Sequence, residues 1–189
     1  MKRIEPFNKY SRRYDNWFAD NEACYQSELA TVKKAIPHSG RGIEIGVGSG
    51  RFAAPLGIKE GIEPSPAMAA IAAEKGIKVI TARAEDIPLP DSSYDFCTLI
   101  TTICFLGNVD QSMGEINRIL KPSGYLIIGF IDKNSIVGRH YLQAKESNVF
   151  YKEAVFFSTK EVICYLQRSN FRLQTAWQTL FKKTDEIKL

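Results

Sequence analysis

The chain has 189 residues, of which 44% are hydrophobic and 24% are charged, a composition that fits one compact globular domain and excludes a disordered chain. Its 25 basic and 21 acidic residues give a net charge of +4 without a dense basic run, so nucleic acid is not an expected partner.

Apolar residues at intervals of three and four predict a helix over residues 14–36, which ends at Pro37. Short runs rich in Ile, Val and Phe then alternate with helical segments, as buried strands do in parallel sheets. The expected strands are 42–45, 61–63, 78–81, 95–100 and 125–132. This order predicts an α/β fold, Rossmann-like and doubly wound, with a mainly parallel sheet and helices on both faces.

Capping signals predict where the helices between these strands begin and end. Ser65 and Pro66 begin a helix that ends near Gly76, and a second helix covers 110–120. Ser158 and Glu161 form a capping box for a helix that ends near Arg168.

An alternating pattern near the C-terminus, from Phe171 to Phe181, predicts a sixth strand. Only Lys182 to Leu189 follow it, which is too little to turn back and form another strand of roughly five or six residues. We therefore expect a final antiparallel seventh strand to be missing, which leaves a neighbouring strand edge unpaired.

The cysteines and the apolar runs limit the location of the chain. Cys24, Cys97, Cys104 and Cys164 are far apart, which predicts buried reduced thiols and neither a disulfide framework nor a metal site. The N-terminus has no apolar signal segment, and no run approaches the roughly 18 apolar residues of a membrane span. We expect a cytoplasmic protein without a membrane partner.

A glycine-rich turn follows the first expected strand, in Glu44-Ile45-Gly46-Val47-Gly48-Ser49-Gly50. Glycine permits a tight turn and close approach of the backbone to a ligand at the carboxyl edge of a parallel sheet, although such a turn also occurs as a plain connection. Arg51 replaces the third glycine of the dinucleotide fingerprint, and Gly-Lys-Ser/Thr is absent. Both departures disfavour NAD, FAD and P-loop nucleotides.

Further polar residues follow the next three strands. Glu63 can accept hydrogen bonds from two ribose hydroxyls, and the alternative is a surface Glu that caps the following helix. The segment Ala84-Glu85-Asp86 can bind the edge of an adenine ring, although such acids are more often solvated. Thr101 and Thr102 can contact the methionine part of a cofactor or cap the backbone.

These motifs together resemble class I S-adenosylmethionine-dependent methyltransferases of the small-molecule group known as methyltransferase type 11. The resemblance rests on Glu-x-Gly-x-Gly-x-Gly at 44–50, Glu-Pro-Ser with a later Met at 63–68, Ala-Glu-Asp-x-Pro at 84–88, Tyr-Asp-Phe at 94–96 and Glu-Ile-x-Arg-Ile-Leu-Lys-Pro-x-Gly at 115–124. It covers residues 42–132 in consistent order, and it implies a mainly structural role for Asp95.

The resemblance implies that residues 44–50 hold the methionine moiety of S-adenosylmethionine, that Glu63 holds the ribose and that 84–86 hold the adenine, with S-adenosylhomocysteine as the product. Tyr14 and Trp17 can form a lid over the cofactor, and ordinary packing of these aromatic side chains against the sheet is the alternative that the residues favour. The full set of expected cofactor-binding residues is Glu44, Gly46, Val47, Gly48, Gly50, Glu63, Pro64, Ser65, Met68, Ala84, Glu85, Asp86, Thr101, Thr102, Tyr14 and Trp17.

The expected reaction is in-line methyl transfer to an unidentified small-molecule acceptor, which can proceed by alignment without a dedicated base. His140 is the only candidate base that the residues suggest, and a polar surface residue is the alternative. One domain is expected over 1–189, made of an N-terminal helical cap (1–40), a cofactor-binding core (41–132), a substrate-side insertion (133–157) and a last helix and strand (158–189).

Two other functions remain open at this point. The chain can bind S-adenosylmethionine without turning it over, as a regulatory or partner protein, since that role needs the same glycines and Glu63. A nicotinamide-dependent oxidoreductase is disfavoured by Arg51 and by the absence of an evident Tyr-x-x-x-Lys set.

Overall fold

The computed structural model describes residues 3–182 and 186–187. Among these, five parallel strands form one sheet in the order β3-β2-β1-β4-β5. The strands are β1 (Gly42–Ile45), β2 (Glu60–Ile62), β3 (Lys78–Ile80), β4 (Tyr94–Ile100) and β5 (Leu120–Gly129). The chain reverses its direction of progress across the sheet between β1 and β4, and ligands bind at such switch points. The expected Rossmann-like α/β fold is confirmed.

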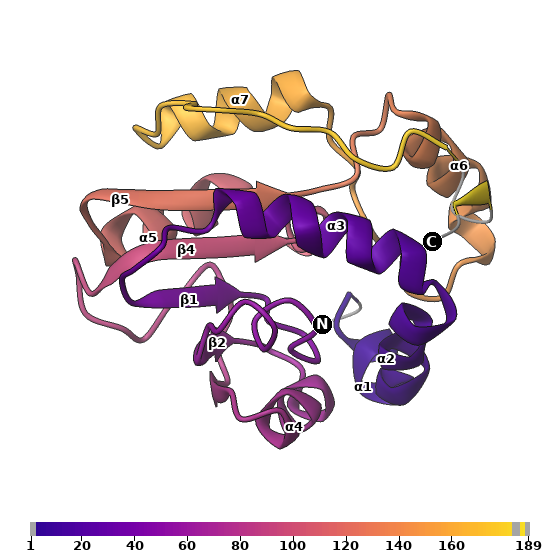
Figure 1. Cartoon of the computed structure of the whole chain (residues 1–189), viewed down its shortest axis with the longest axis horizontal. Coiled ribbons are helices and arrows are strands. Elements are labelled where there is room, and N and C mark those ends of the chain that lie inside the picture. Colours follow the sequence, from indigo (N-terminus) through magenta and orange to yellow (C-terminus); the bar gives the residue numbers. More distant parts are fainter. Residues whose placement is uncertain (1–2, 183–185, 188–189) are drawn as a thin grey trace.

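Helices cover both faces of this sheet. On one face, α3 (Glu22–Ala35) packs through Tyr25 and Val32 against Phe52 and Ile100. On the other face, α5 (Val109–Ile119) and α7 (Thr159–Arg168) bury apolar side chains against β1 and β4. Figure 1 shows α3 crossing one face of the strands along much of their length.

The N-terminal part does not form the single helix expected over 14–36. It is divided into α1 (Glu5–Lys9), α2 (Ser11–Asp20) and α3, with Asn21 between α2 and α3 at φ −124° and ψ 44°. The Trp17 carbonyl accepts from both the backbone amide and the side-chain amide of Asn21, each at 2.9 Å, at the point where α2 ends. The break lets α1 and α2 lie at the carboxyl ends of the strands while α3 follows the sheet (Figure 1).

The other capping predictions agree with the structure. Ser65 accepts from the amide of Met68 at the start of α4 (Pro66–Glu74), and Ser158 and Glu161 form the expected capping box of α7. The helix expected over 110–120 begins slightly earlier, because Asn108 rather than a later residue provides the cap. The expected insertion contains α6 (Ile136–Ala144), and short 3₁₀ turns lie at Ile103–Phe105 and Lys145–Ser147.

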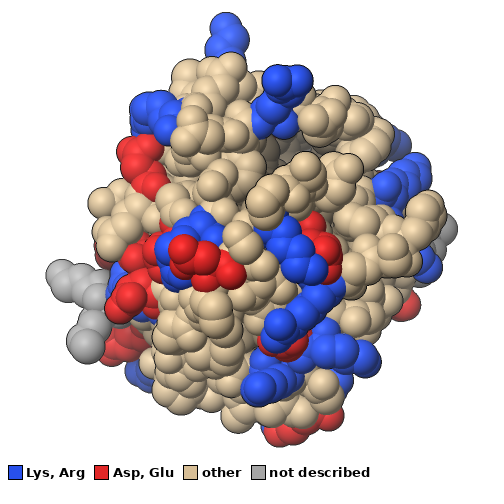
Figure 2. All heavy atoms as spheres, turned by 90° about the vertical axis from the view of Figure 1, so that its left-hand side faces the viewer, with Lys and Arg blue, Asp and Glu red and all other residues tan. Residues whose placement is uncertain are grey.

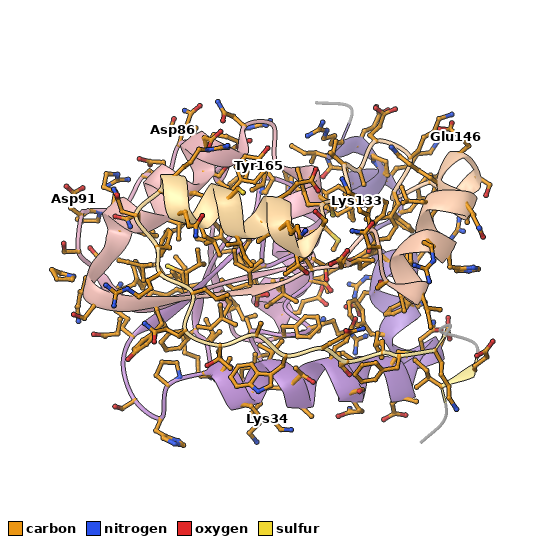
Figure 3. The ribbon with its side chains drawn as sticks, turned by 90° about the horizontal axis from the view of Figure 1, so that it is seen from above. Lys34, Asp86, Asp91, Lys133, Glu146 and Tyr165 are labelled. Carbon is orange, nitrogen blue, oxygen red and sulfur yellow. The ribbon has the colours of Figure 1, made fainter. Side chains whose placement is uncertain are left out.

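The sixth strand expected over 171–181 is wrong, because this segment has no strand pairing in the structure. It runs between α3 and α7 along the side of the molecule where β5 ends the sheet (Figures 1 and 3). A hydrogen bond of 2.6 Å joins Thr179 to Ser27 of α3, and Leu173, Trp177 and Phe181 are about half exposed or more. Alternation indicates which side chains share a face, but a strand also needs a partner edge at hydrogen-bonding distance.

The expectation that a seventh strand is missing concerns residues 182–189, of which 183–185 and 188–189 lie outside the described residues. In the described part of the chain, β5 pairs with β4 alone, and no antiparallel strand lies on its other side. The backbone groups along that edge of β5 are therefore left without a strand partner.

The structure tests the predicted burial of the four cysteines and shows how the charged side chains are distributed. Cys24, Cys97 and Cys104 are buried as expected, but Cys164 is exposed on α7, which corrects the prediction for that residue. On the face at the amino ends of the strands, basic and acidic side chains are interspersed (Figure 2). Arg41 and Glu60 form one ion pair, at 2.8 Å. Within residues 3–182 and 186–187, no helix is both long enough and apolar enough to cross a bilayer.

Candidate functional site

A cavity of about 390 Å³ opens at the carboxyl ends of β1, β2 and β4, beneath α1 and α2. It lies where the sheet topology predicts a ligand site. Of the residues expected to bind the cofactor, its wall contains Tyr14, Glu44, Gly46, Val47, Gly48, Glu63, Pro64, Met68, Ala84, Glu85, Thr101 and Thr102.

The remaining expected residues lie outside this wall and have other contacts. A Cβ on Gly50 would lie 2.5 Å from Ile77, so this glycine is required for packing. Ser65 is fully buried, where it caps α4 and donates to Asn8 at 2.6 Å. Asp86 is exposed, as Figure 3 shows, and Trp17 faces a second cavity.

The glycine turn is held in a conformation that few other residues adopt. Gly46 has φ +71° and Gly48 has φ +55°, both in the left-handed region. The amide of Gly46 donates to the Ile62 carbonyl at 2.8 Å, and Thr102 lies so close that a Cβ on Gly46 would be 2.3 Å from it. The turn is therefore fixed between β2 and the end of β4.

Glu63 is buried in the cavity wall, with 7% of its surface exposed. One carboxylate oxygen accepts from the Gly48 amide at 2.9 Å, and the other accepts from the Ser65 amide at 2.8 Å. Burial raises the pKa of Glu63, and the two amides oppose that rise. The alternative, a surface residue that caps the following helix, is wrong because Glu63 is buried. Glu63 does, however, accept a hydrogen bond from the Ser65 amide just before α4. Each oxygen keeps a further lone pair for a ligand.

Glu44 supplies an unusual polar group to the same wall. The residue is 2% exposed, and its Oε2 atom has no hydrogen-bond partner among the described residues. Burial raises the pKa of Glu44 well above its ordinary value, with a smaller contribution from the charge of Glu63. A buried oxygen without a partner is costly unless a ligand satisfies it, and a cationic ligand group would also favour the ionised form.

The segment after β3 contributes through packing and loop attachment. Ala84 is buried in the cavity wall, while the Glu85 carboxylate accepts from the amides of Gly107 at 2.6 Å and Asn108 at 3.2 Å. Burial alone would raise the pKa of Glu85, but these hydrogen bonds lower it overall. Glu85 thus fixes the loop that follows β4 on the far side of the cavity.

Aromatic side chains cover the cavity, and sequence reasoning missed most of them. The ring of Phe7 lies 5.2 Å from Tyr14 and 5.1 Å from Phe105, and Tyr14 lies 5.2 Å from Phe150. The spacing of seven and then four residues from Phe7 through Tyr14 to Phe18 was a usable helical signal. No such signal joins Phe105 and Phe150 to them, because only the fold brings these segments together.

An ionic cluster around the buried Asp15 attaches α2 to the glycine turn. Asp15, which is 8% exposed, pairs with Arg51 at 2.7 Å and with Lys75 at 2.9 Å, and Lys75 also donates to the Ser49 carbonyl at 2.6 Å. Burial alone would raise the pKa of Asp15, but the hydrogen bonds from the two cations hold it well below its ordinary value. Arg51, which replaces the third glycine of the dinucleotide fingerprint, therefore has a structural partner in the helical cap.

His140 does not lie with these groups. It is exposed on α6 and lines neither the cavity at the ends of β1, β2 and β4 nor the second one. Its geometry gives no support to the hypothesis that it acts as a base. Asp95 accepts from the Arg41 amide at 2.7 Å and pairs with Lys121 at 2.8 Å, contacts that fit the structural role inferred for it.

The chain is similar to known methyltransferases in sequence and in structure. Residues 43–128 match a family model described as a methyltransferase domain. A crystal structure from Thermotoga maritima, described as an S-adenosylmethionine-dependent methyltransferase and possible histamine N-methyltransferase, is 46% identical, with a TM-score of 0.87. The match covers 89% of this chain and 81% of that one.

Two sequence relatives extend the comparison. An uncharacterized protein of Methanocaldococcus jannaschii is 46% identical over 96% of this chain and 88% of its own length. A demethylmenaquinone methyltransferase of Chlorobaculum tepidum is 32% identical over 61% of this chain, which spans about half (51%) of that enzyme. The family-model match across the sheet and the close structural match together show that this chain belongs to the class I S-adenosylmethionine-dependent methyltransferases.

Proposed function

We propose that the chain binds S-adenosylmethionine in the cavity at the ends of β1, β2 and β4 and transfers its methyl group to a small-molecule acceptor. The observation that carries this proposal is the pair of buried carboxylates in one wall. Glu63 is oriented by two backbone amides, and Glu44 has an oxygen without a partner among the described residues.

The chemistry of these two groups fits the two ends of the cofactor. The ribose hydroxyls can donate to the free lone pairs of Glu63, and the cationic amino-acid end can meet the unsatisfied oxygen of Glu44. Between them, Gly48 leaves open space, because a Cβ there would meet only Met68, at 3.5 Å, and the Gly46 carbonyl, at 4.0 Å. A volume of about 390 Å³ is in the range of small-ligand sites.

The cofactor supplies a methyl group on an electrophilic sulfonium, so the chain needs mainly to align the acceptor and exclude water. Phe7, Tyr14 and Phe105 cover the cavity with apolar surface and can exclude water from it. The ionic cluster of Asp15, Arg51 and Lys75 keeps that cover attached to the glycine turn. No residue with the geometry of a dedicated base is required for this reaction.

The proposal is tested first by calorimetric titration with S-adenosylmethionine, S-adenosylhomocysteine and NAD. We expect the first two to bind at one site and NAD not to bind. Preferential binding of NAD would contradict the proposal.

Turnover is then measured as S-adenosylhomocysteine formed with a panel of small acceptors. The panel includes histamine, because the description of the Thermotoga protein names it. Formation of product with one class of acceptor would support catalysis. Binding of S-adenosylmethionine without turnover of any acceptor would favour a regulatory or partner protein instead.

A further inference from the structure

A second cavity, of about 630 Å³, adjoins the cofactor-side cavity. Ile100 and Thr101, at the end of β4, belong to the walls of both. Thr101 turns the chain there with φ +51° and donates its amide to Gly129 of β5 at 2.7 Å. Both cavities therefore border the carboxyl end of β4.

The second cavity contains a carboxylate without a protein partner. Glu28 of α3 is partly buried in its wall, and it makes no hydrogen bond or ion pair with the described residues. Burial raises the pKa of Glu28 to about 7. The other acid in this wall, Asp132, is satisfied by Thr159 and by the Asn134 amide. Glu28 is thus the acid of this wall that remains available to a ligand.

Aromatic side chains share the wall of this cavity with Glu28. Trp17 of α2, Tyr141 of α6 and Trp177 of the C-terminal segment line the same cavity. Tyr141, Tyr14 and Tyr151 lie near enough to Glu28 for its charge to raise their pKa, after the larger effect of burial. A carboxylate among aromatic faces favours an organic cation, which gains both a charge partner and cation–π contacts.

We propose that the second cavity is the acceptor site of this chain and that Glu28 selects a protonated amine attached to an apolar body. This inference rests on the proposed methyltransferase function and deepens it. The wall of this cavity includes residues of α2, of α3 and of the expected substrate-side insertion, together with the open edge of β5, α7 and the C-terminal segment.

The proposed reaction balances with the groups present. The amine nitrogen forms a bond to the methyl carbon, and the bond from that carbon to sulfur breaks with its electron pair going to sulfur. Starting from a protonated primary amine, the products are the N-methylammonium ion, S-adenosylhomocysteine and one proton. In this proposal the Glu28 carboxylate accepts that proton before the nitrogen attacks.

The test compares three probes of similar shape with the protein saturated by S-adenosylhomocysteine. They are phenethylamine, phenethyl alcohol and 3-phenylpropionate, with dissociation constants measured by calorimetry at pH 8. We expect the amine to bind at least about tenfold tighter than the alcohol, as for one charge-assisted contact, and the acid not to bind. Glu28→Gln should remove this preference, whereas Glu22→Gln, an exposed residue on the same helix, should keep it.

A pH series separates the role of the charge from a structural role. Between pH 6 and pH 8 the amine should bind more tightly to the parent protein as Glu28 ionises, while its affinity for Glu28→Gln should stay flat. The groups that face Glu28 are Tyr14 from α2, Cys24 from α3, Tyr141 from α6, and Tyr151. Burial raises the pKa of all four, from ordinary values that already lie above this window. Arg139 and Asp132 line the same cavity. Burial alone would raise the pKa of Asp132, but hydrogen bonds lower it overall.

The outcomes distinguish this inference from the proposed function. Equal binding of amine and alcohol, unchanged amine binding by Glu28→Gln, or no binding of any probe would each overturn the inference. The affinity for S-adenosylhomocysteine in the same samples shows whether each variant is folded. If the parent protein did not bind S-adenosylhomocysteine, the proposed function itself would be overturned.

Discussion

The glycine turn at 44–50 and the C-terminal segment at 171–181 both carry a clear sequence pattern, but only the first has the expected structure. Around the turn, the amides of Gly46 and Val47 donate to Ile62 at 2.8 and 2.9 Å, and Gly48 donates to Glu63 at 2.9 Å. The C-terminal segment has one side-chain hydrogen bond at Thr179 and exposed aromatic residues at Trp177 and Phe181.

The difference shows what a pattern needs before it determines structure. The turn lies between two strands that already pair, so its backbone groups meet partners on β2. The C-terminal segment passes the edge of β5 without forming a ladder, so its alternating side chains gain no pleated face. Four substitutions test this comparison, beginning with the one expected to have the largest effect.

Replacing Gly46 with Ala should lower the free energy of unfolding by about 3 kcal/mol, because a left-handed conformation and a crowded Cβ are both unfavourable. The added Cβ would lie 2.3 Å from Thr102. Urea denaturation measures the loss. Gly57→Ala is the matched control, since Gly57 has φ +75° but no atom within 4 Å of its Cβ, and should cost only about 1 kcal/mol. Equal losses would show that Thr102 does not confine the turn.

Asp15→Asn should lower the free energy of unfolding at pH 7 by roughly 2 kcal/mol, a value reduced from that of fully buried pairs because Arg51 and Lys75 are partly exposed. The folded-state pKa of Asp15 lies below its ordinary value. Its contribution is therefore complete above about pH 4 and is lost as the pH falls through the folded-state pKa.

Denaturation curves from pH 7 down to pH 3 follow this contribution. The difference in stability between the Asn variant and the parent protein should begin to narrow below about pH 4 and should still be present at pH 3, because the folded-state pKa of Asp15 lies well below its ordinary value. Asp110→Asn, which breaks an exposed pair with Arg168, should cost less than about 0.5 kcal/mol and serves as the control. A constant difference between Asp15→Asn and the parent over this range would mean that the charge of Asp15 is not what stabilises the contact.

Glu63→Ala should weaken binding of S-adenosylmethionine by roughly 1.5 to 3 kcal/mol, the scale of losing charge-assisted hydrogen bonds. Glu63 also accepts from the amides of Gly48 and Ser65, so thermal stability should fall as well. Calorimetry measures the affinity, with Glu74→Ala as an exposed control. Unchanged affinity would mean that the ribose is held elsewhere.

Trp177→Ser should change the free energy of unfolding by less than about 0.5 kcal/mol, because the side chain is 54% exposed. Leu99→Ala, at a fully buried position of β4, should cost about 3 kcal/mol in the same urea titration. If Trp177→Ser cost 1.5 kcal/mol or more, the C-terminal segment would be packed as an element of the fold, and its contrast with the glycine turn would disappear.

The sequence determined those features that depend on neighbours in the chain. Short apolar runs predicted each strand to within a few residues, because strands buried on both faces need near-continuous apolar side chains. The exception is the start of β5, which begins at Leu120 and not at residue 125 as expected. The Ser65 cap and the glycine turn were equally local. The sequence pattern continued through Asn21 without a break, however, and the helix there is interrupted.

Only the tertiary structure decided which distant residues complete the site. It placed Phe105 and Phe150 beside Phe7, joined Arg51 to Asp15, and left Glu28 in a cavity next to Thr101. It also left the segment at 171–181 unpaired despite its alternation. The physical reason is the same in each case. The periodicity of a sequence indicates which face of a helix or strand a residue occupies. Its hydrogen bonds, ion pairs and burial depend on which other residues the fold places against that face.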